Sequence, residues 1–450
     1  MKVSKFNYCL FNKENELLLY NSFLGSSSFC KINEKEAPVA YALLKSKSPK
    51  ITNENSFLYN KLLANGFIID DFIDEDALMY AQYIKSINDN HLHLVINPTD
   101  SCNFKCIYCY ECDSNSFMST EIQDDIINFV KKEIHKFKGL KVSWFGGEPL
   151  LAMDTIEKLS RAFIEICAKT KRSYIATITT NGYLLSIENF MKLLDYRVIH
   201  YQITLDGIKL IHDRQRPLKS GKGTFDKIIE NLYNIKEKCN RAIYTISLRT
   251  NYTKDVLPYL DEYLDLIETK FMNNRHFDIL IRPADDWGGE RVKSSTSILF
   301  GNNKDYIREV FNKMHGRQLS FKLMKGFFDP GGNFCYAAQL NSYSINSQGE
   351  ISKCTTDLKN NPFAKIGQIY KGVTINEHDA YKWLISYENT CSCFFKPVCL
   401  GIKCPKALFE QKHILSDNTY STVQCPFEKD YIDDLFILFD NIGMFSYLDV

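Results

Sequence analysis

Three cysteines lie close together in the segment Cys102–Cys109, which reads Cys-Asn-Phe-Lys-Cys-Ile-Tyr-Cys and has the spacing C-x3-C-x2-C. Thiolates are soft ligands that bind zinc, Cu(I) and iron–sulfur clusters. A cubane cluster takes four ligands and this loop supplies three, so one iron is left open for a ligand that is not protein. Catalytic metal sites differ from closed structural sites in the same way. A structural zinc loop with Cys112 as the fourth ligand is the alternative.

An aromatic residue, Tyr108, precedes the last cysteine, and with it the loop is similar to the cysteine motif of the radical S-adenosylmethionine (radical SAM) enzymes. The resemblance implies that Cys102, Cys106 and Cys109 bind a [4Fe-4S] cluster whose open iron is chelated by SAM. It also implies that the cluster and SAM together yield a 5′-deoxyadenosyl radical, which abstracts hydrogen from an unactivated carbon. Tyr108 is expected to pack beside adenine.

A second motif, the segment Trp144–Pro149, reads Trp-Phe-Gly-Gly-Glu-Pro. Paired glycines let the backbone approach a ligand closely, and a carboxylate accepts a hydrogen bond from an ammonium group. Standing alone, the motif is a glycine-rich turn. In the resembled family it binds the amino group of SAM, which assigns Gly146, Gly147 and Glu148 to cofactor binding.

Polar residues also follow the later expected strands. The resemblance implies that Thr180, Asn181 and Thr204 contact the ribose and carboxylate of SAM, although the family usually has serine where Thr204 stands. Basic and amide side chains that are able to bind a carboxylate form a further group, with a loop hydrogen bond or a solvated charge as the alternative for each: Arg214, Arg216, Arg249 and Asn251. The polar loop 281–289 offers Asp285 and Asp286 as candidate general bases.

Residues 91–300 alternate between apolar runs and segments with helical periodicity, and a helix at 305–313 would close the sixth unit. We expect strands at 93–97, 141–145, 174–180, 200–205, 242–250 and 277–281, and helices at 121–138, 154–169, 186–194, 224–237, 256–267 and 305–313. This alternation predicts an α/β fold with a parallel sheet and helices outside it. Six units suit an open, partial (β/α)6 TIM-like barrel, which is also the core of the resembled family. Ligands of such sheets lie at the carboxyl ends of the strands, where the motifs fall.

The C-terminal part contains seven further cysteines, whose order is similar to that of the SPASM domain, an extension with two auxiliary [4Fe-4S] clusters. Two of the central spacings depart from the family pattern by one residue. The resemblance assigns Cys335, Cys354 and Cys404 to a proximal cluster, and it assigns to a distal cluster Cys391, Cys393, Cys399 and Cys425. The proximal set lacks a fourth thiolate, which predicts a site open to a substrate thiolate or water. Asp329 as a ligand, a smaller cluster, or a pair of zinc ions are the alternatives.

Residues 1–90 are expected to form two short strands, two or three short helices and another strand. This order is similar to the small winged-helix domain with which peptide-modifying radical SAM enzymes hold a leader peptide. A packing extension without a recognition role is the alternative. The predicted domains are therefore 1–90 for leader recognition, 91–315 for the partial barrel and 316–450 for the SPASM domain.

The formal charge of +1 argues against a protein held on nucleic acid or on a membrane surface by bulk electrostatics. No apolar stretch is long enough for a membrane span, and the N-terminus does not resemble a signal peptide. We therefore expect a cytoplasmic protein, in which fifteen cysteines indicate metal binding or catalysis more than disulfides.

Together these features predict a radical SAM maturase of a ribosomally synthesised peptide that forms a thioether or a C–C cross-link. Its expected partners are a precursor peptide with a leader and an electron donor, either flavodoxin or ferredoxin. An anaerobic sulfatase-maturing enzyme, which makes formylglycine, is the alternative within enzymes, and the residues ahead of the cysteine loop weigh against it. A non-catalytic electron-transfer or zinc-scaffold protein is the alternative from another class.

Overall fold

A ten-stranded mixed sheet is the central feature of the computed structural model, in the order β11-β10-β9-β8-β7-β6-β12-β13-β14-β15. The structure describes residues 1–111, 114–286, 290–293, 295–299, 304–357, 364–369, 373–376, 380–381, 383–384, 393–401, 404–407 and 425–448. Because β11 and β15 form the two edges of this sheet, it is open and does not close into a barrel.

Six consecutive strands of this sheet pair in parallel and in chain order. They are β6 (His91–Ile96), β7 (Gly139–Trp144), β8 (Ser173–Thr180), β9 (Val198–Thr204), β10 (Thr245–Tyr252) and β11 (Phe277–Pro283). The main helices between and after them are α4 (Thr120–Glu133), α5 (Met153–Thr170), α6 (Ile187–Asp195), α7 (Lys209–Gln215), α8 (Phe225–Lys238), α9 (Leu260–Ile267) and α11 (Lys304–Met314). The expected partial (β/α)6 barrel is confirmed, and α7 is an addition that sequence periodicity did not predict.

Helix α5 shows why these segments fold as they do. Its buried residues Ile156, Leu159, Phe163 and Cys167 recur at helical spacing and face the sheet core. Cys167 is thereby a core residue. The N-cap of α4 is Ser119, whose hydroxyl accepts from the amide of Ile122.

The C-terminal part extends the same sheet instead of forming a separate layer. Strand β12 (Ser342–Ile345) pairs in parallel with β6, and three strands follow it in antiparallel order. These are β13 (Glu350–Ser352), β14 (Lys365–Ile369) and β15 (Val373–Ile375). The segment that carries Cys335 and Cys354 is therefore attached next to the first strand of the barrel.

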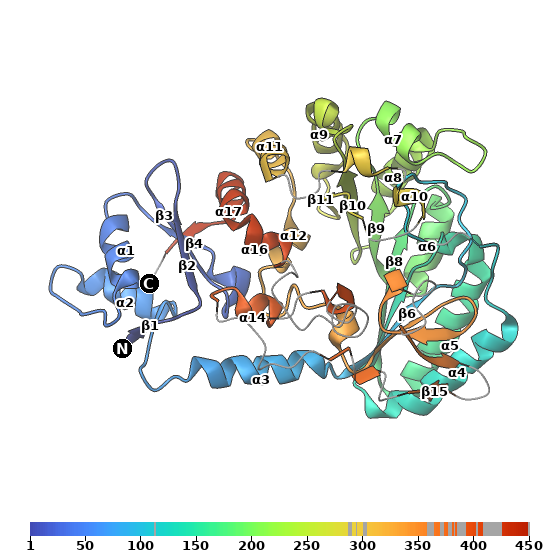
Figure 1. Cartoon of the computed structure of the whole chain (residues 1–450), viewed down its shortest axis with the longest axis horizontal. Helices are drawn as coiled ribbons and strands as arrows, with labels where there is room; N and C mark the ends of the chain where they lie inside the picture. Colours follow the sequence, from blue (N-terminus) through green and yellow to red (C-terminus); the bar gives the residue numbers. More distant parts are fainter. Residues whose placement is uncertain are drawn as a thin grey trace.

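The N-terminal part is a second, four-stranded sheet in the order β16-β4-β3-β2. Its strands are β2 (Asn7–Phe11), β3 (Leu17–Asn21), β4 (Cys30–Ile32) and β16 (Ser446–Tyr447), with helices α1 (Ala37–Lys45) and α2 (Ser56–Ala64) on one face. A short pair, β1 (Lys2–Val3) and β5 (Ile68–Ile69), lies beside it, and helix α3 (Glu75–Ile87) runs from this part to the barrel (Figure 1).

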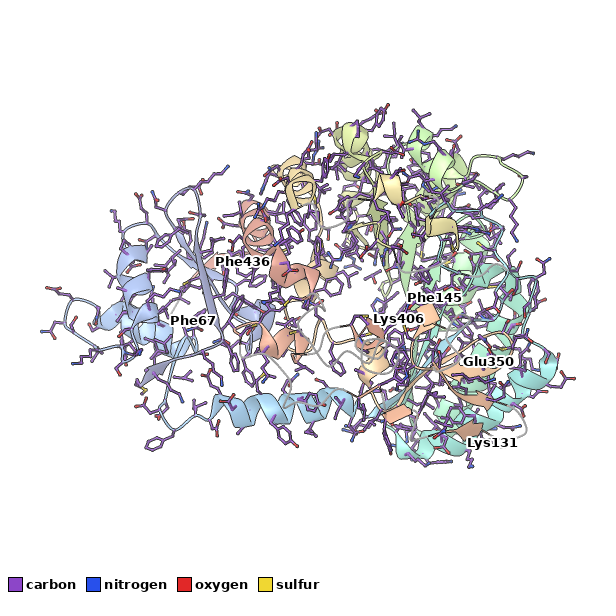
Figure 2. All side chains as sticks on the ribbon, in the orientation of Figure 1. Phe67, Lys131, Phe145, Glu350, Lys406 and Phe436 are labelled. Atoms are coloured by element: carbon purple, nitrogen blue, oxygen red, sulfur yellow. The ribbon has the colours of Figure 1, made fainter. Side chains whose placement is uncertain are left out.

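Both faces of the N-terminal sheet are buried, because alternate residues of β3 enter two different cores. Leu17 and Leu19 join the core under α1 and α2, whereas Leu18 and Tyr20 join the main core that contains helix α17 (Ile432–Asn441). Figure 2 labels one residue of each core, Phe67 and Phe436. The N-terminal sheet is thus packed onto the C-terminal helix. Across the described residues, no helix is both long and apolar enough to cross a membrane.

Candidate active site

A cavity of about 330 Å³ lies at the carboxyl ends of the parallel strands, in the size range of small-molecule sites. Its walls come from the cysteine loop, the turn after β7, the ends of β8 to β11 and one residue of the C-terminal extension, Thr356. The sequence-predicted residues that line it are Cys102, Cys106, Tyr108, Cys109, Gly146, Gly147, Thr180, Asn181, Thr204, Arg216, Arg249, Asn251 and Asp285. The structure therefore brings most of the predicted site together.

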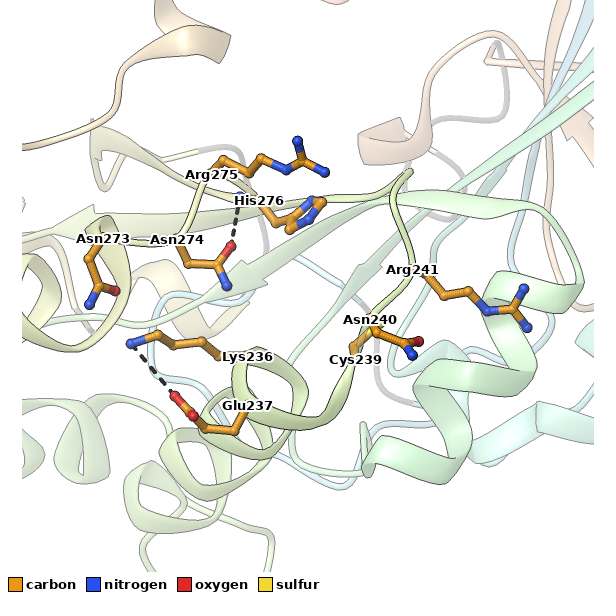
Figure 3. Close-up of a pocket in the computed structure, with 9 residues that line it drawn as sticks. All are labelled: Lys236, Glu237, Cys239, Asn240, Arg241, Asn273, Asn274, Arg275 and His276. Atoms are coloured by element: carbon orange, nitrogen blue, oxygen red, sulfur yellow. Dashed lines mark hydrogen bonds and ion pairs between the residues drawn. The ribbon is translucent and has the colours of Figure 1, made fainter.

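Another pocket, shown in Figure 3, lies just before β10 and β11, at the opposite ends of the strands. It has a volume of about 620 Å³ and is lined by residues 236–237, 239–241 and 273–276. None of the predicted site residues belongs to its lining, so the cavity at the carboxyl ends is the candidate active site.

The cysteine loop is held against the segment that follows α7. Phe104 forms an antiparallel bridge with Leu218. Two backbone bonds make this bridge, from the amide of Lys105 to Pro217 O at 2.8 Å and from that of Lys219 to Asn103 O at 2.9 Å, and the amide of Ile107 adds a bond to Gln215 O, at the end of α7, at 3.0 Å. The loop thus has fixed backbone geometry before any metal binds.

The three thiols of the loop are largely shielded from water, and Cys106 is 9% exposed. Burial raises the pKa of Cys102 and of Cys109 to about 12, and it also raises the pKa of Cys106. The Arg216 guanidinium opposes this rise at Cys106. A cationic iron centre compensates thiolate charge, so this donor set fits an iron–sulfur cluster.

No three His, Cys, Asp or Glu side chains in the described ranges are grouped so as to hold one metal ion. Cys112, the fourth ligand of the zinc alternative, lies outside the described residues.

The glycine pair after β7 approaches the backbone that leads into the cysteine loop. A Cβ on Gly146 would lie 2.5 Å from Thr99 O, and a Cβ on Gly147 would lie 2.3 Å from Ser101 O. Gly146 also has φ of +106°, which favours glycine. The amide of Glu148 donates to Ser101 O at 2.9 Å. The glycines are therefore required for the turn to dock on the loop, in addition to lining the cavity.

The Glu148 carboxylate is not among the residues that line the cavity, and its contact with the amine of SAM stays a prediction. It is 0% exposed and accepts three hydrogen bonds, from the amide of Leu150, the hydroxyl of Thr180 and the amide of Asn181. Burial raises its pKa, and these donors oppose the rise. Glu148 therefore joins the turn after β7 to the end of β8, and the backbone of the turn is what faces the cavity.

Two other predicted residues lie away from the cavity. The Arg214 side chain is 58% exposed, pairs with Asp255 at 2.7 Å and is not among the residues that line the cavity. Asp285 and Asp286 are both exposed, and Asp285 lines the cavity. The role of general base stays a prediction for both carboxylates.

Sequence reasoning passed over several residues of the site. Gln202, Phe145 and Thr356 line the cavity. Asp206 lies behind it, fully buried, and binds the Tyr108 hydroxyl. The acidic residue at the end of an apolar strand was the available signal for Asp206, whereas Thr356 reaches the cavity only through the tertiary fold.

The predicted proximal trio lies within electrostatic reach of one another. Burial raises the pKa of Cys335 to about 12, and the neighbouring Cys354 and Cys404 contribute to the rise. Cys354 Sγ lies 3.1 Å from Oγ1 of Thr356, which lines the cavity, so this one member of the trio lies beside it. Asp329, the alternative ligand, accepts from the amide and hydroxyl of Ser26.

The predicted distal set stays a prediction. Cys391 lies outside the described residues. Cys399 Sγ lies 3.6 Å from Phe395 O, and Lys429 Nζ lies 3.2 Å from Cys425 Sγ. Cys393 is partly buried.

The fold and this cavity define an enzyme of the partial-barrel α/β class with a three-cysteine loop at its ligand-binding end. Residues 96–264 match the radical SAM superfamily. Residues 96–264 therefore form a radical SAM domain and the chain is an enzyme, and this domain implies SAM and one [4Fe-4S] cluster as cofactors.

Among curated proteins, the chain is similar to a GTP 3′,8-cyclase of Aliarcobacter butzleri, with 26% identity over 67% of this chain and 94% of the relative. It is also similar to the radical SAM cyclopropyl synthase TigE of Paramaledivibacter caminithermalis, with 23% identity over 58% of this chain and 61% of the relative. Among solved structures, native anSMEcpe with bound AdoMet and Kp18Cys peptide matches with a TM-score of 0.55 and 18% identity, over 78% of this chain and 98% of that one. The last similarity supports the fold.

Proposed function

We propose that this enzyme matures a ribosomally synthesised peptide, abstracting hydrogen from one residue and forming a thioether or a C–C cross-link. The observation that carries the proposal is the position of the C-terminal extension. The same segment supplies Thr356 to the cavity and Cys354 to the proximal trio. Cys354 Sγ lies 3.1 Å from Thr356 Oγ1. A second thiolate site beside the radical site suits a substrate that presents its own thiolate.

The proposed cofactor site follows from the residues already described. Cys102, Cys106 and Cys109 hold the cluster, and with SAM bound the site supplies a 5′-deoxyadenosyl radical for hydrogen abstraction. Gly146 and Gly147 line the cavity at the turn after β7, and Thr180, Asn181 and Thr204 line it at the strand ends, so these residues would contact the bound cofactor.

Arg249 is the proposed anchor for a carboxylate in this cavity. Its Nε donates to Asn251 Oδ1 at 2.9 Å, and burial lowers its pKa. A partner carboxylate from a ligand restores the charge balance of a buried guanidinium. Asp285, on the wall formed by the end of β11, is the proposed proton acceptor.

A peptide as substrate is part of the same proposal. The anSMEcpe structure that shares this fold holds a Kp18Cys peptide, and we transfer only the class of ligand to this chain. The N-terminal part, with its sheet and two helices, is the proposed binding site of a leader. The proposal also includes the proximal and distal clusters, a flavodoxin or ferredoxin as the electron donor, and a cytoplasmic location.

The test uses anaerobically reconstituted enzyme with SAM, a reductant and candidate precursor peptides encoded near the gene. Loss of two hydrogens from the peptide mass supports the proposal, whereas 5′-deoxyadenosine without a change in the peptide contradicts it. Conversion of a cysteine or serine to formylglycine would instead identify a sulfatase-maturing enzyme.

A matched pair of variants separates the two metal sites. Replacing Cys335, Cys354 and Cys404 with alanine is expected to keep cleavage of SAM and to abolish the change in peptide mass. Replacing Cys9 and Cys239 with alanine, both half-buried and outside every predicted ligand set, is expected to change neither.

A further inference from the structure

Behind the cavity, a buried carboxylate connects the cysteine loop to the barrel. Asp206 follows β9 and is 0% exposed. Its Oδ2 accepts from the Tyr108 hydroxyl, and its Oδ1 accepts from the backbone amide of Asn251 at 2.7 Å. Tyr108 lies between two of the cluster cysteines, whereas Asn251 lies in β10, so one side chain joins the loop to two neighbouring strands.

Arg216 completes this group. Its Nη1 donates to the Tyr108 hydroxyl at 2.8 Å and lies 3.8 Å from Asp206 Oδ2. The Tyr108 hydroxyl therefore donates to one charged residue and accepts from another, which fixes its position in both hydrogen-bonding directions. Phe104 of the same loop packs against the guanidinium, with its centroid 5.8 Å away.

Asp206 and Arg216 are also held by residues that do not contact the cysteine loop. The His212 ring binds the amide of Asp206 at 3.1 Å through Nδ1 and lies 3.1 Å from the Thr224 hydroxyl through Nε2. That hydroxyl donates in turn to Arg216 O at 2.8 Å. Although Arg216 Nε has no hydrogen-bond partner among the described residues, the rest of this buried network is connected, so movement of one member costs its neighbours their partners.

We propose that Asp206 is a positioning residue for the cluster loop. It fixes the position of Tyr108 and, through Tyr108, that of the backbone between Cys106 and Cys109 relative to the carboxyl ends of β9 and β10. Backbone bonds hold the loop at Lys105 and Ile107, and the Tyr108 side chain adds a link to β9 and β10 between Cys106 and Cys109. This inference rests on the radical SAM domain and is independent of the proposed peptide substrate.

The test is a double-mutant cycle with Asp206→Asn and Tyr108→Phe in the reconstituted enzyme, measured without peptide. Asp206→Asn keeps the side-chain shape but offers one acceptor oxygen, and Tyr108→Phe removes only a hydroxyl. Each variant is expected to lower the rate of 5′-deoxyadenosine formation about tenfold, since each removes a charge-assisted hydrogen bond. The double variant is expected to lose no more than either single one, because both act on one link.

Tyr201→Phe is the matched control. Tyr201 lies in β9, is 1% exposed, and its hydroxyl has no hydrogen-bond partner within the described part of the chain. This variant is expected to keep the wild-type rate of 5′-deoxyadenosine formation. Combined with Asp206→Asn, it is expected to give the same rate as Asp206→Asn alone.

A spectroscopic measurement separates positioning from general destabilisation. The reduced cluster of Tyr108→Phe and of Asp206→Asn is expected to give an EPR spectrum whose response to SAM differs from wild type, at unchanged iron content and melting temperature. Additive losses in the cycle would overturn the proposal. So would a loss confined to Tyr108→Phe, since that result means that the hydroxyl acts on the cofactor directly.

Discussion

The Thr180 hydroxyl donates a hydrogen bond of 2.7 Å to Oε1 of Glu148 and thereby joins the end of β8 to the turn after β7. The amide of Asn181 donates to Oε2 of the same carboxylate at 2.8 Å, and the amide of Leu150 donates to Oε1 at 3.0 Å. Two walls of the cavity thus depend on one buried carboxylate.

Glu148→Gln is expected to weaken both the fold and the binding of SAM. The amide group of glutamine places two donors where N–H and O–H donors already point, so at least one of the three bonds is lost. We expect the free energy of unfolding to fall by about 1–3 kcal/mol, which urea denaturation measures. Affinity for SAM is expected to fall as well, because Gly147 and Asn181 belong to the walls that Glu148 joins.

Glu165→Gln provides the comparison for this substitution. Glu165 lies on the surface of α5 and pairs there with Lys169. The change is expected to leave stability and SAM affinity at wild-type values. If Glu148→Gln behaved in the same way, the role assigned to the buried carboxylate would be wrong.

Replacing Cys102, Cys106 and Cys109 together with alanine is expected to remove one cluster, about four irons, and all cleavage of SAM. Iron and sulfide analysis with EPR checks this outcome. Reconstituted wild-type protein with three clusters is expected to hold about twelve irons. Protein that contained two zinc ions and no iron would favour the scaffold alternative.

Phe436→Ala is expected to loosen the N-terminal sheet from the rest of the molecule. Phe436 of α17 is 0% exposed, and its ring centroid lies 5.5 Å from that of Tyr20 and 5.3 Å from that of Phe29. The resulting cavity is expected to cost about 3–5 kcal/mol. Denaturation measures the loss, and limited proteolysis is expected to show faster cleavage near α3.

Phe57→Ala is the control, because Phe57 belongs to the same N-terminal part but is 59% exposed. It is expected to unfold at the wild-type urea concentration. Equal destabilisation by the two substitutions would contradict the assignment of α17 as the support of the N-terminal sheet.

Acid is expected to destabilise the protein through His93 of β6. Burial lowers the pKa of His93 from 6.5 to about 4. Between these values the unfolded chain binds a proton that the folded chain does not bind, so stability falls as the pH drops from 6.5 towards 4. The contribution reaches at most about 3.4 kcal/mol, at 1.36 kcal/mol for each pKa unit.

His93→Gln checks this source of acid sensitivity. Its stability is expected to depend less steeply on pH between 6.5 and 4 than that of wild type, as measured by urea denaturation at a series of pH values. His135, exposed on the turn after α4, supplies the control, and its replacement is expected to leave the slope unchanged. Parallel curves for wild type and His93→Gln would contradict the expectation.

Local patterns in the sequence were enough to predict the barrel and the cysteine loop. The alternation of apolar runs with segments of helical periodicity predicted six parallel units, and the spacing of Cys102, Cys106 and Cys109 indicated the metal chemistry. Such signals are readable because period, composition and ligand spacing are properties of neighbouring residues. The cavity-lining positions of Thr180, Asn181 and Thr204 followed from the same rule, since parallel strands present their carboxyl ends at one edge.

Only the tertiary structure decided where long-range partners go. It placed the Glu148 carboxylate between the turn after β7 and the end of β8, paired Arg214 with Asp255 on the surface, and placed Asp206 next to Tyr108. It also attached β12 to β6 and packed the N-terminal sheet on α17. The direction of a side chain and the pairing of distant strands depend on which groups bury one another, and that competition is settled across the whole chain.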